Sequence, residues 1–127
     1  MRQILSLALA FCLAMTVAIR PVAAQESAAV KTIAGILMTI NHFPSDADKK
    51  TLTSLAGQSS TTDQEKVLIT AILGMQHSIA AADKPKVEAV MKDAKASAGA
   101  KTIATILDKF LHTASADEKA ALKKIAS

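Results

Sequence analysis

The stretch Asn41–Lys50, NHFPSDADKK, contains a histidine, a few small residues, two acids and two lysines. The same pattern returns as QHSIAAADKPK at Gln76–Lys86 and as LHTASADEKAA at Leu111–Ala121. Each copy begins 35 residues after the one before it, and no gap is needed to align them. Self-similarity at a fixed period is typical of repeat architectures, so it is considered before any local pattern.

The period also relates apolar positions that lie outside the histidine segments. A shift of 35 residues connects the following sets: Ile33, Leu68 and Ile103; Leu37, Ile72 and Leu107; Ile40, Met75 and Phe110. Agreement at this many positions predicts three structurally equivalent units. We place them at about residues 25–59, 60–94 and 95–127.

Each unit is predicted to begin with a helix. Ser27, Thr62 and Ser97 occupy equivalent positions, and hydroxyl side chains of this kind cap helix N-termini. Apolar residues then recur at intervals of three and four, which places them on one face of a helix. The first helix of each unit is expected to end near the histidine.

A second helix is predicted in each unit after the histidine segment. Ser45 and Ser115 are each followed three residues later by an acid, the pattern of a capping box. The second unit differs, because Pro85 is tolerated only in the first turn of a helix. We therefore expect that helix to begin later, with Asp83 as its cap.

The predicted fold class is all-α, with six helices as three tandem helix-turn-helix hairpins of 35-residue period. One hairpin of this size cannot bury its apolar face alone, so the units must pack on each other. Two arrangements satisfy this requirement: a compact bundle around a pseudo-three-fold axis, or a short right-handed solenoid.

Residues 1–24 are predicted to be a cleavable signal peptide. Arg2 precedes an apolar run, and Val22 and Ala24 fit the small-residue positions before a cleavage site. The run is short for a bilayer span, so no stable membrane anchor is expected after cleavage. Residues 25–127 are then a single domain, located in the bacterial periplasm or secreted.

The composition of residues 25–127 limits the partners that we expect. Without Arg2 and Arg20, 13 basic residues stand against 11 acidic ones, a net charge of +2. A weak and mixed charge with few aromatic residues argues against a nucleic-acid partner. The single cysteine, Cys12, lies in the signal peptide, so no disulfide is expected.

The repeated histidines and acids are interpreted first as structural corners between paired helices. A histidine near a helix C-terminus and an acid near the next N-terminus both complement the helix dipole. An alternative is a pH-responsive corner, in which each histidine contacts the acid six residues later. The candidate site consists of His42, Asp48, His77, Asp83, His112 and Glu118.

A second alternative is a metal site formed by His42, His77 and His112. Three imidazoles are a known ligand set for zinc, and their donor atoms must lie within about 3–4 Å of one another. Equivalent histidines in a solenoid would be separated by about 8–10 Å or more. Only the closed bundle could bring them together, so the sequence alone favours the structural interpretation and predicts no cofactor.

The function predicted from the sequence is a non-enzymatic interaction module of the bacterial cell envelope. Its partner would be a protein or peptide, and a homo-oligomer is compatible with the pattern. The alternatives are a periplasmic stress holdase or small-ligand carrier using Met38, Met75 and Met91, or the metal-binding protein described above. No serine stands in a nucleophile motif, and the acids serve as caps, so no enzymatic site is predicted.

Overall fold

The computed structural model describes residues 25–127, and within this range the chain is all-helical, with six helices and no β-strand. The signal peptide predicted for residues 1–24 lies outside the described residues. The helices are α1 (Ala28–Thr39), α2 (Asp46–Ala56), α3 (Asp63–Leu73), α4 (Lys84–Lys92), α5 (Ala98–Lys109) and α6 (Ala116–Ala126). None of these helices is long and apolar enough to cross a membrane.

The predicted caps account for where the helices begin. Ser27, Thr62 and Ser97 each accept a backbone hydrogen bond in the first turn of α1, α3 and α5. Ser45 and Ser115 form complete capping boxes at the starts of α2 and α6. Hydroxyl caps satisfy amide groups that a helix cannot pair internally, so these starts are determined locally.

Helix α4 begins where the proline requires it to begin. Asp83 is the residue before the helix, and Pro85 lies in the first turn. The Asp83 side chain makes no capping bond, however, and instead contacts the Lys86 ammonium at 3.2 Å. The start of this helix is therefore determined by the fixed φ of proline rather than by a cap.

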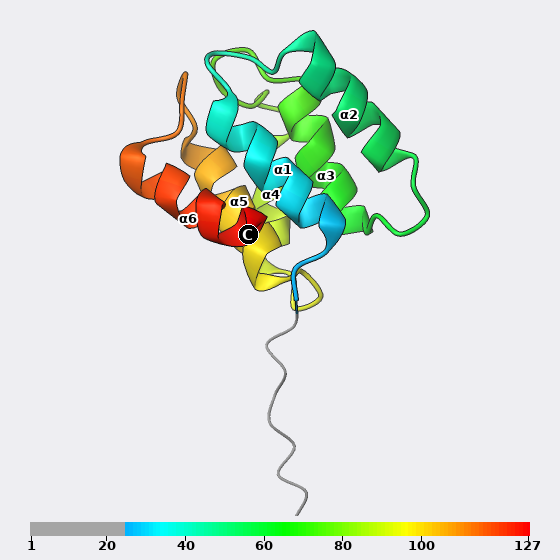
Figure 1. Ribbon diagram of the computed structural model, residues 1–127. Coiled ribbons are helices and arrows are strands. Elements are labelled where there is room, and N and C mark those ends of the chain that lie inside the picture. Colours follow the sequence, from blue (N-terminus) through cyan, green and yellow to red (C-terminus); the bar gives the residue numbers. More distant parts are fainter. Residues whose placement is uncertain (1–24) are drawn as a thin grey trace, which may run out of the picture.

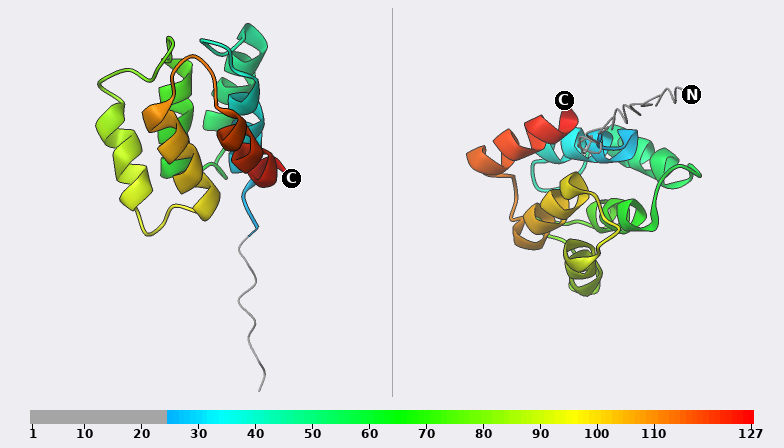
Figure 2. Two further views of the ribbon diagram at one scale, coloured as in Figure 1. Left: turned by 90° about the vertical axis from the view of Figure 1, so that its left-hand side faces the viewer. Right: turned by 90° about the horizontal axis from the view of Figure 1, so that it is seen from below.

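The helices are packed compactly, with three in the middle and three outside them. Helices α1, α3 and α5 run in the same direction through the middle, and α2, α4 and α6 lie around them (Figures 1 and 2). Helix α2 packs on α3, α4 packs on α5, and α6 packs back on α1. The contact between the last helix and the first closes the arrangement, so the fold is a bundle and not a solenoid.

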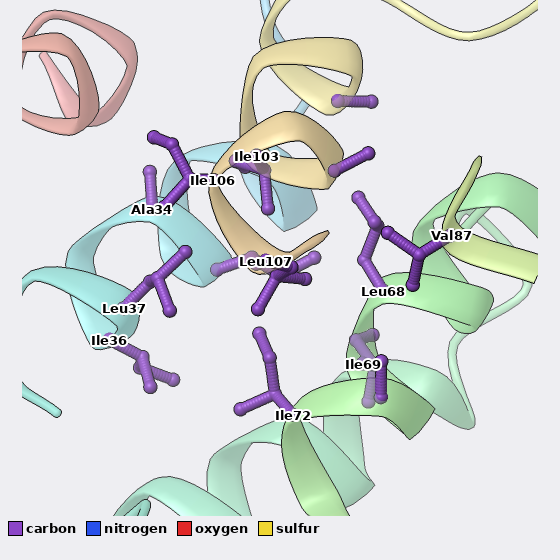
Figure 3. Close-up of a cluster of buried hydrophobic side chains, with 14 of the residues drawn as sticks. Ala34, Ile36, Leu37, Leu68, Ile69, Ile72, Val87, Ile103, Ile106 and Leu107 are labelled. Atoms are coloured by element: carbon purple, nitrogen blue, oxygen red, sulfur yellow. The ribbon is translucent and has the colours of Figure 1, made fainter. Parts of the chain in front are cut away.

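The core lies between the three central helices. Leu37 of α1, Ile72 of α3 and Leu107 of α5 are fully buried, and their side chains approach one another in Figure 3. The outer helices add Leu52, Val87 and Leu122, which are also fully buried. Leu37, Ile72 and Leu107 form one of the equivalent sets that the 35-residue period connects.

Parallel central helices give the molecule two distinct ends. At one end α1, α3 and α5 begin, and Ser27 donates a hydrogen bond to Glu65 across the helices. At the other end the three helices finish, and the segments with the histidines follow. The C-terminal ends of three helices are therefore gathered on the histidine side (Figure 2).

Candidate metal centre

The three histidines share an unusual backbone conformation. His42, His77 and His112 have φ angles of 72°, 65° and 67°, and they are the only described residues with positive φ. This left-handed region costs an L-residue about 1–2 kcal/mol, whereas glycine enters it freely. The chain places a histidine at each of these positions even though glycine would be less strained.

Short turns surround two of the histidines. The Ser78 amide donates to the Gln76 carbonyl at 2.7 Å, and the Thr113 amide donates to the Leu111 carbonyl at 2.8 Å. A bond between residues two apart closes a γ-turn, and a positive φ at its centre belongs to the rare, strained form. The histidine thus lies at the tip of a tight turn.

The backbones of the three histidines are joined in a ring. The His42 amide donates to the His112 carbonyl at 2.6 Å, and the His77 amide donates to the His42 carbonyl at 2.8 Å. The His112 amide completes the ring by donating to the His77 carbonyl at 2.7 Å. These bonds span 35 and 70 residues of sequence, so only the closed bundle can form them.

Buried residues hold each turn from both sides. The residues two before the histidines and two after them are all buried: Ile40 and Pro44, Met75 and Ile79, Phe110 and Ala114. Side chains that are anchored in a close-packed core restrict the chain between them. The turns are therefore rigid, and their positions are fixed before any ligand arrives.

The imidazoles converge above this ring. Their ring centroids lie 5.0–5.1 Å apart, and one ligating nitrogen from each lies within 4.8 Å of the others. His77 and His112 are exposed and His42 is half-buried. Because no described side chain or backbone group is hydrogen-bonded to these rings, side-chain rotation can bring their nitrogens to the 3–4 Å that one ion requires.

The surrounding backbone favours positive charge at this end. Helices α1, α3 and α5 all finish within four residues of a histidine. Each helix end carries about half a negative charge, which stabilises a nearby cation. Three such ends converge on the same cluster, so the field of the bundle favours a cation bound between the imidazoles.

The acids predicted to pair with the histidines have other partners. The carboxylates of Asp48 and Glu118 accept the amides of Ser45 and Ser115 in the capping boxes. No ion pair between a histidine and an acid is present among residues 25–127. The pH-responsive contact considered for the turns is therefore not formed, and the six candidate residues separate into a histidine cluster and three acids at helix starts.

Comparison of the chain with protein-family models, with curated proteins and with solved structures found no match. Zinc is bound in proteins by histidine, cysteine and carboxylate ligands, and three histidines leave one coordination position open. The cluster has the donor set and the open side of such a centre.

Two features near the cluster were not predicted from the sequence. Phe43 and Leu111 are adjacent in sequence to His42 and His112, and they are 59% and 64% exposed. The sequence offered one signal for their exposure: Phe43 directly follows His42, and Leu111 directly precedes His112. By contrast, the methionines considered for a ligand groove contribute to the core: Met75 is buried, and Met38 and Met91 pack against buried residues.

Proposed function

We propose that this chain is an exported metal-binding protein of the bacterial cell envelope, with His42, His77 and His112 as the ligands of a zinc-like transition-metal ion. One observation carries the proposal: three histidines converge at positions where the backbone favours glycine. Strain retained at several equivalent positions points to a role for the side chains. The proposed role is binding rather than catalysis.

The proposed architecture is three tandem hairpins of 35-residue period behind a cleavable signal peptide. Equivalent positions have equivalent roles, since each unit supplies one histidine with positive φ and one amide of the backbone ring. A three-fold arrangement explains how a chain without a local metal motif can assemble three ligands. Each unit contributes only one, and the closure of the bundle brings them together.

The binding test compares the wild-type protein with the triple variant His42→Asn, His77→Asn and His112→Asn. Asparagine tolerates the left-handed conformation, so the variant keeps the turns while it removes the imidazoles. Both proteins are expressed from the full chain without a histidine tag and titrated with Zn²⁺ by calorimetry. We expect saturable binding in the wild type and at least about a 100-fold weaker affinity in the variant.

A thermal melt supplies an independent readout. A ligand at 100 times its Kd stabilises the folded state by about 2.7 kcal/mol, which raises the Tm of a domain of this size by about 10 °C or more. Zn²⁺ should raise the Tm of the wild type and leave that of the triple variant unchanged. Equal responses in the two proteins would refute the histidine site.

Export is tested separately from binding. The full chain is expressed in a bacterial host, and the mass of the protein recovered from the periplasm is measured. We expect the mass of residues 25–127, corresponding to cleavage after Ala24. Recovery of the uncleaved chain from the cytoplasm would contradict the proposed location without affecting the metal site.

An interaction module remains a second candidate function. The observation that favours it is the exposure of Phe43 and Leu111 beside the histidines, because large apolar side chains on a surface often mark a contact with another molecule.

A further inference from the structure

We propose that the metal centre is shared between two copies of this chain, which meet through the face that carries the histidines. The inference rests on the proposed metal binding and adds the partner that completes the coordination. We define the histidine face as residues 41–43, 76–78 and 111–113.

The histidine face is free of charged residues. Its nine positions hold three histidines, Asn41, Gln76, Ser78, Thr113 and the two exposed apolar residues Phe43 and Leu111. One fifth of the whole chain is charged, so this composition distinguishes the face. Two identical faces can approach without like-charge repulsion, which is the electrostatic condition for contact between copies.

A depression beside the cluster provides a receptor for an apolar side chain. It has a volume of about 460 Å³ and is lined by Phe43, Lys49, Leu73, Gly74, Met75, Gln76 and His77. Its lysine already lies 3.7 Å from the Asp46 carboxylate. The remaining lining is apolar or neutral, so the depression suits an aliphatic side chain such as that of Leu111 from a second copy.

A two-fold axis lying in the histidine face would bury Phe43 and Leu111 of both copies at the same time. Such an axis relates the first and third turns of opposite copies, so Leu111 of each copy lies over Phe43 and the depression of the other. Isologous contacts of this kind pair residue i with j and j with i. The axis also places the two histidine clusters opposite each other.

The coordination chemistry favours the same arrangement. An ion held by three imidazoles of one copy has an open position directed away from that copy. A second copy placed face to face offers its own imidazoles, and an ion on the two-fold axis takes the same number of ligands from each copy, so two imidazoles from each complete the four-ligand set that zinc prefers. One ion can then be bound by donors from both chains, and the predicted stoichiometry is one ion for two chains.

The test measures molar mass by light scattering after size exclusion, together with bound zinc, for untagged wild-type protein with Zn²⁺ and with EDTA. We expect twice the monomer mass and half an equivalent of zinc per chain with Zn²⁺, and a monomer with EDTA. A monomer that binds one equivalent would overturn the shared centre but retain the proposed function. A protein that binds no zinc would overturn both.

A matched variant uses residues that the chain itself places at equivalent positions. In Phe43→Ser and Leu111→Gln, the new residues are those found at Ser78 and Gln76. We expect the double variant to bind zinc but to remain a monomer at concentrations where the wild type is a dimer. A zinc-dependent dimer of unchanged strength would refute the apolar contact.

The triple asparagine variant is the control for metal dependence. It retains Phe43 and Leu111 but lacks the imidazoles, so it should be a monomer with or without Zn²⁺. If this variant forms a dimer as readily as the wild type does with zinc, the ion is not the bridge and the proposal fails.

Discussion

The two ends of the bundle satisfy their polar groups in different ways. Where α1, α3 and α5 begin, Ser27 donates to Glu65, and Ser97 donates to Glu26. The Gly99 amide also donates to Glu26 at 2.7 Å. Glu65 is only 4% exposed, and its oxygens receive both Ser27 and the Thr62 amide. At this end, hydrogen bonds from hydroxyl and amide donors to the Glu65 and Glu26 carboxylates connect segments that are distant in sequence.

At the histidine end, the backbone groups of the three histidines are hydrogen-bonded, whereas their side chains are not. The ring of amide bonds pairs the peptide groups of His42, His77 and His112, yet their imidazoles have no hydrogen-bond partner among the described residues. Phe43 and Leu111 remain exposed there. The comparison teaches that the first end contributes stability, whereas the second retains strained and unpaired groups that are suited to a ligand.

The largest expected effect is at the buried carboxylate. Glu65→Ala should destabilise the protein by about 2–3 kcal/mol, because it removes a buried side chain and a capping box and leaves the part-buried Ser27 hydroxyl and Thr62 amide without their acceptor. Chemical denaturation measures this loss. Gln76→Ala on the histidine face is the control and should change stability by less than about 0.5 kcal/mol. Equal losses of stability for Glu65→Ala and Gln76→Ala would contradict the proposed difference between the two ends.

A smaller difference is expected for two serines. Ser97→Ala should cost about 1–2 kcal/mol, since this serine caps α5 and bridges to Glu26. Ser78→Ala should cost less than about 0.5 kcal/mol, because the Ser78 side chain makes no hydrogen bond within residues 25–127. Urea denaturation of the two variants under the same conditions provides the comparison, and the reverse order would contradict it.

The strained turn predicts an unusual tolerance to glycine. In the metal-free protein, relief of the left-handed strain at His77→Gly opposes the greater entropy of the unfolded chain. The net change should stay within about 0.5 kcal/mol, whereas Ala89→Gly at an exposed position of helix α4 should cost about 1 kcal/mol. A loss at His77 larger than that at Ala89 would mean that the imidazole itself stabilises the turn.

The smallest effect concerns a half-buried carboxylate, Asp93, at the end where the central helices begin. The Gln64 amide donates to Asp93 at 2.6 Å and the Lys95 backbone amide donates at 2.8 Å, and these bonds hold the pKa of Asp93 below its ordinary value. A lowered folded-state pKa contributes stability above the unfolded value that is lost as pH falls through the folded value. Asp93→Asn should therefore lower the Tm slightly near neutral pH and lose this effect in strong acid.

A second variant checks the origin of that pH dependence. Gln64→Ala removes the principal hydrogen bond and should reproduce part of the difference between wild type and Asp93→Asn. If the Tm difference of Asp93→Asn is the same at acidic and neutral pH, the hydrogen-bonded carboxylate is not its cause.

Local features were predictable because neighbouring residues determine them. The caps at Ser27, Thr62 and Ser97 were identified from the sequence, and the delayed start of α4 followed from Pro85. A cap bonds an amide three residues away, and a proline restricts its own turn. Neither interaction depends on the rest of the fold.

The cross-helix contacts were not predictable in the same way. Thr62 was identified as a cap, but the contact of its capping partner Glu65 with Ser27 spans 38 residues. Phe43 and Phe110 have the same side chain and both lie near a histidine, yet one is exposed and the other is buried. The position of each on the closed bundle decides which of them reaches the core.

The sequence by itself determined the helices, their caps and the spacing of the histidines, because these depend on short-range hydrogen bonds and on the period of apolar residues. Only the tertiary structure decided that α6 packs on α1 and that three distant histidines converge. The physical reason is that a solenoid and a closed bundle use the same local interactions. They differ only in long-range packing and in hydrogen bonds that form once the chain has closed on itself.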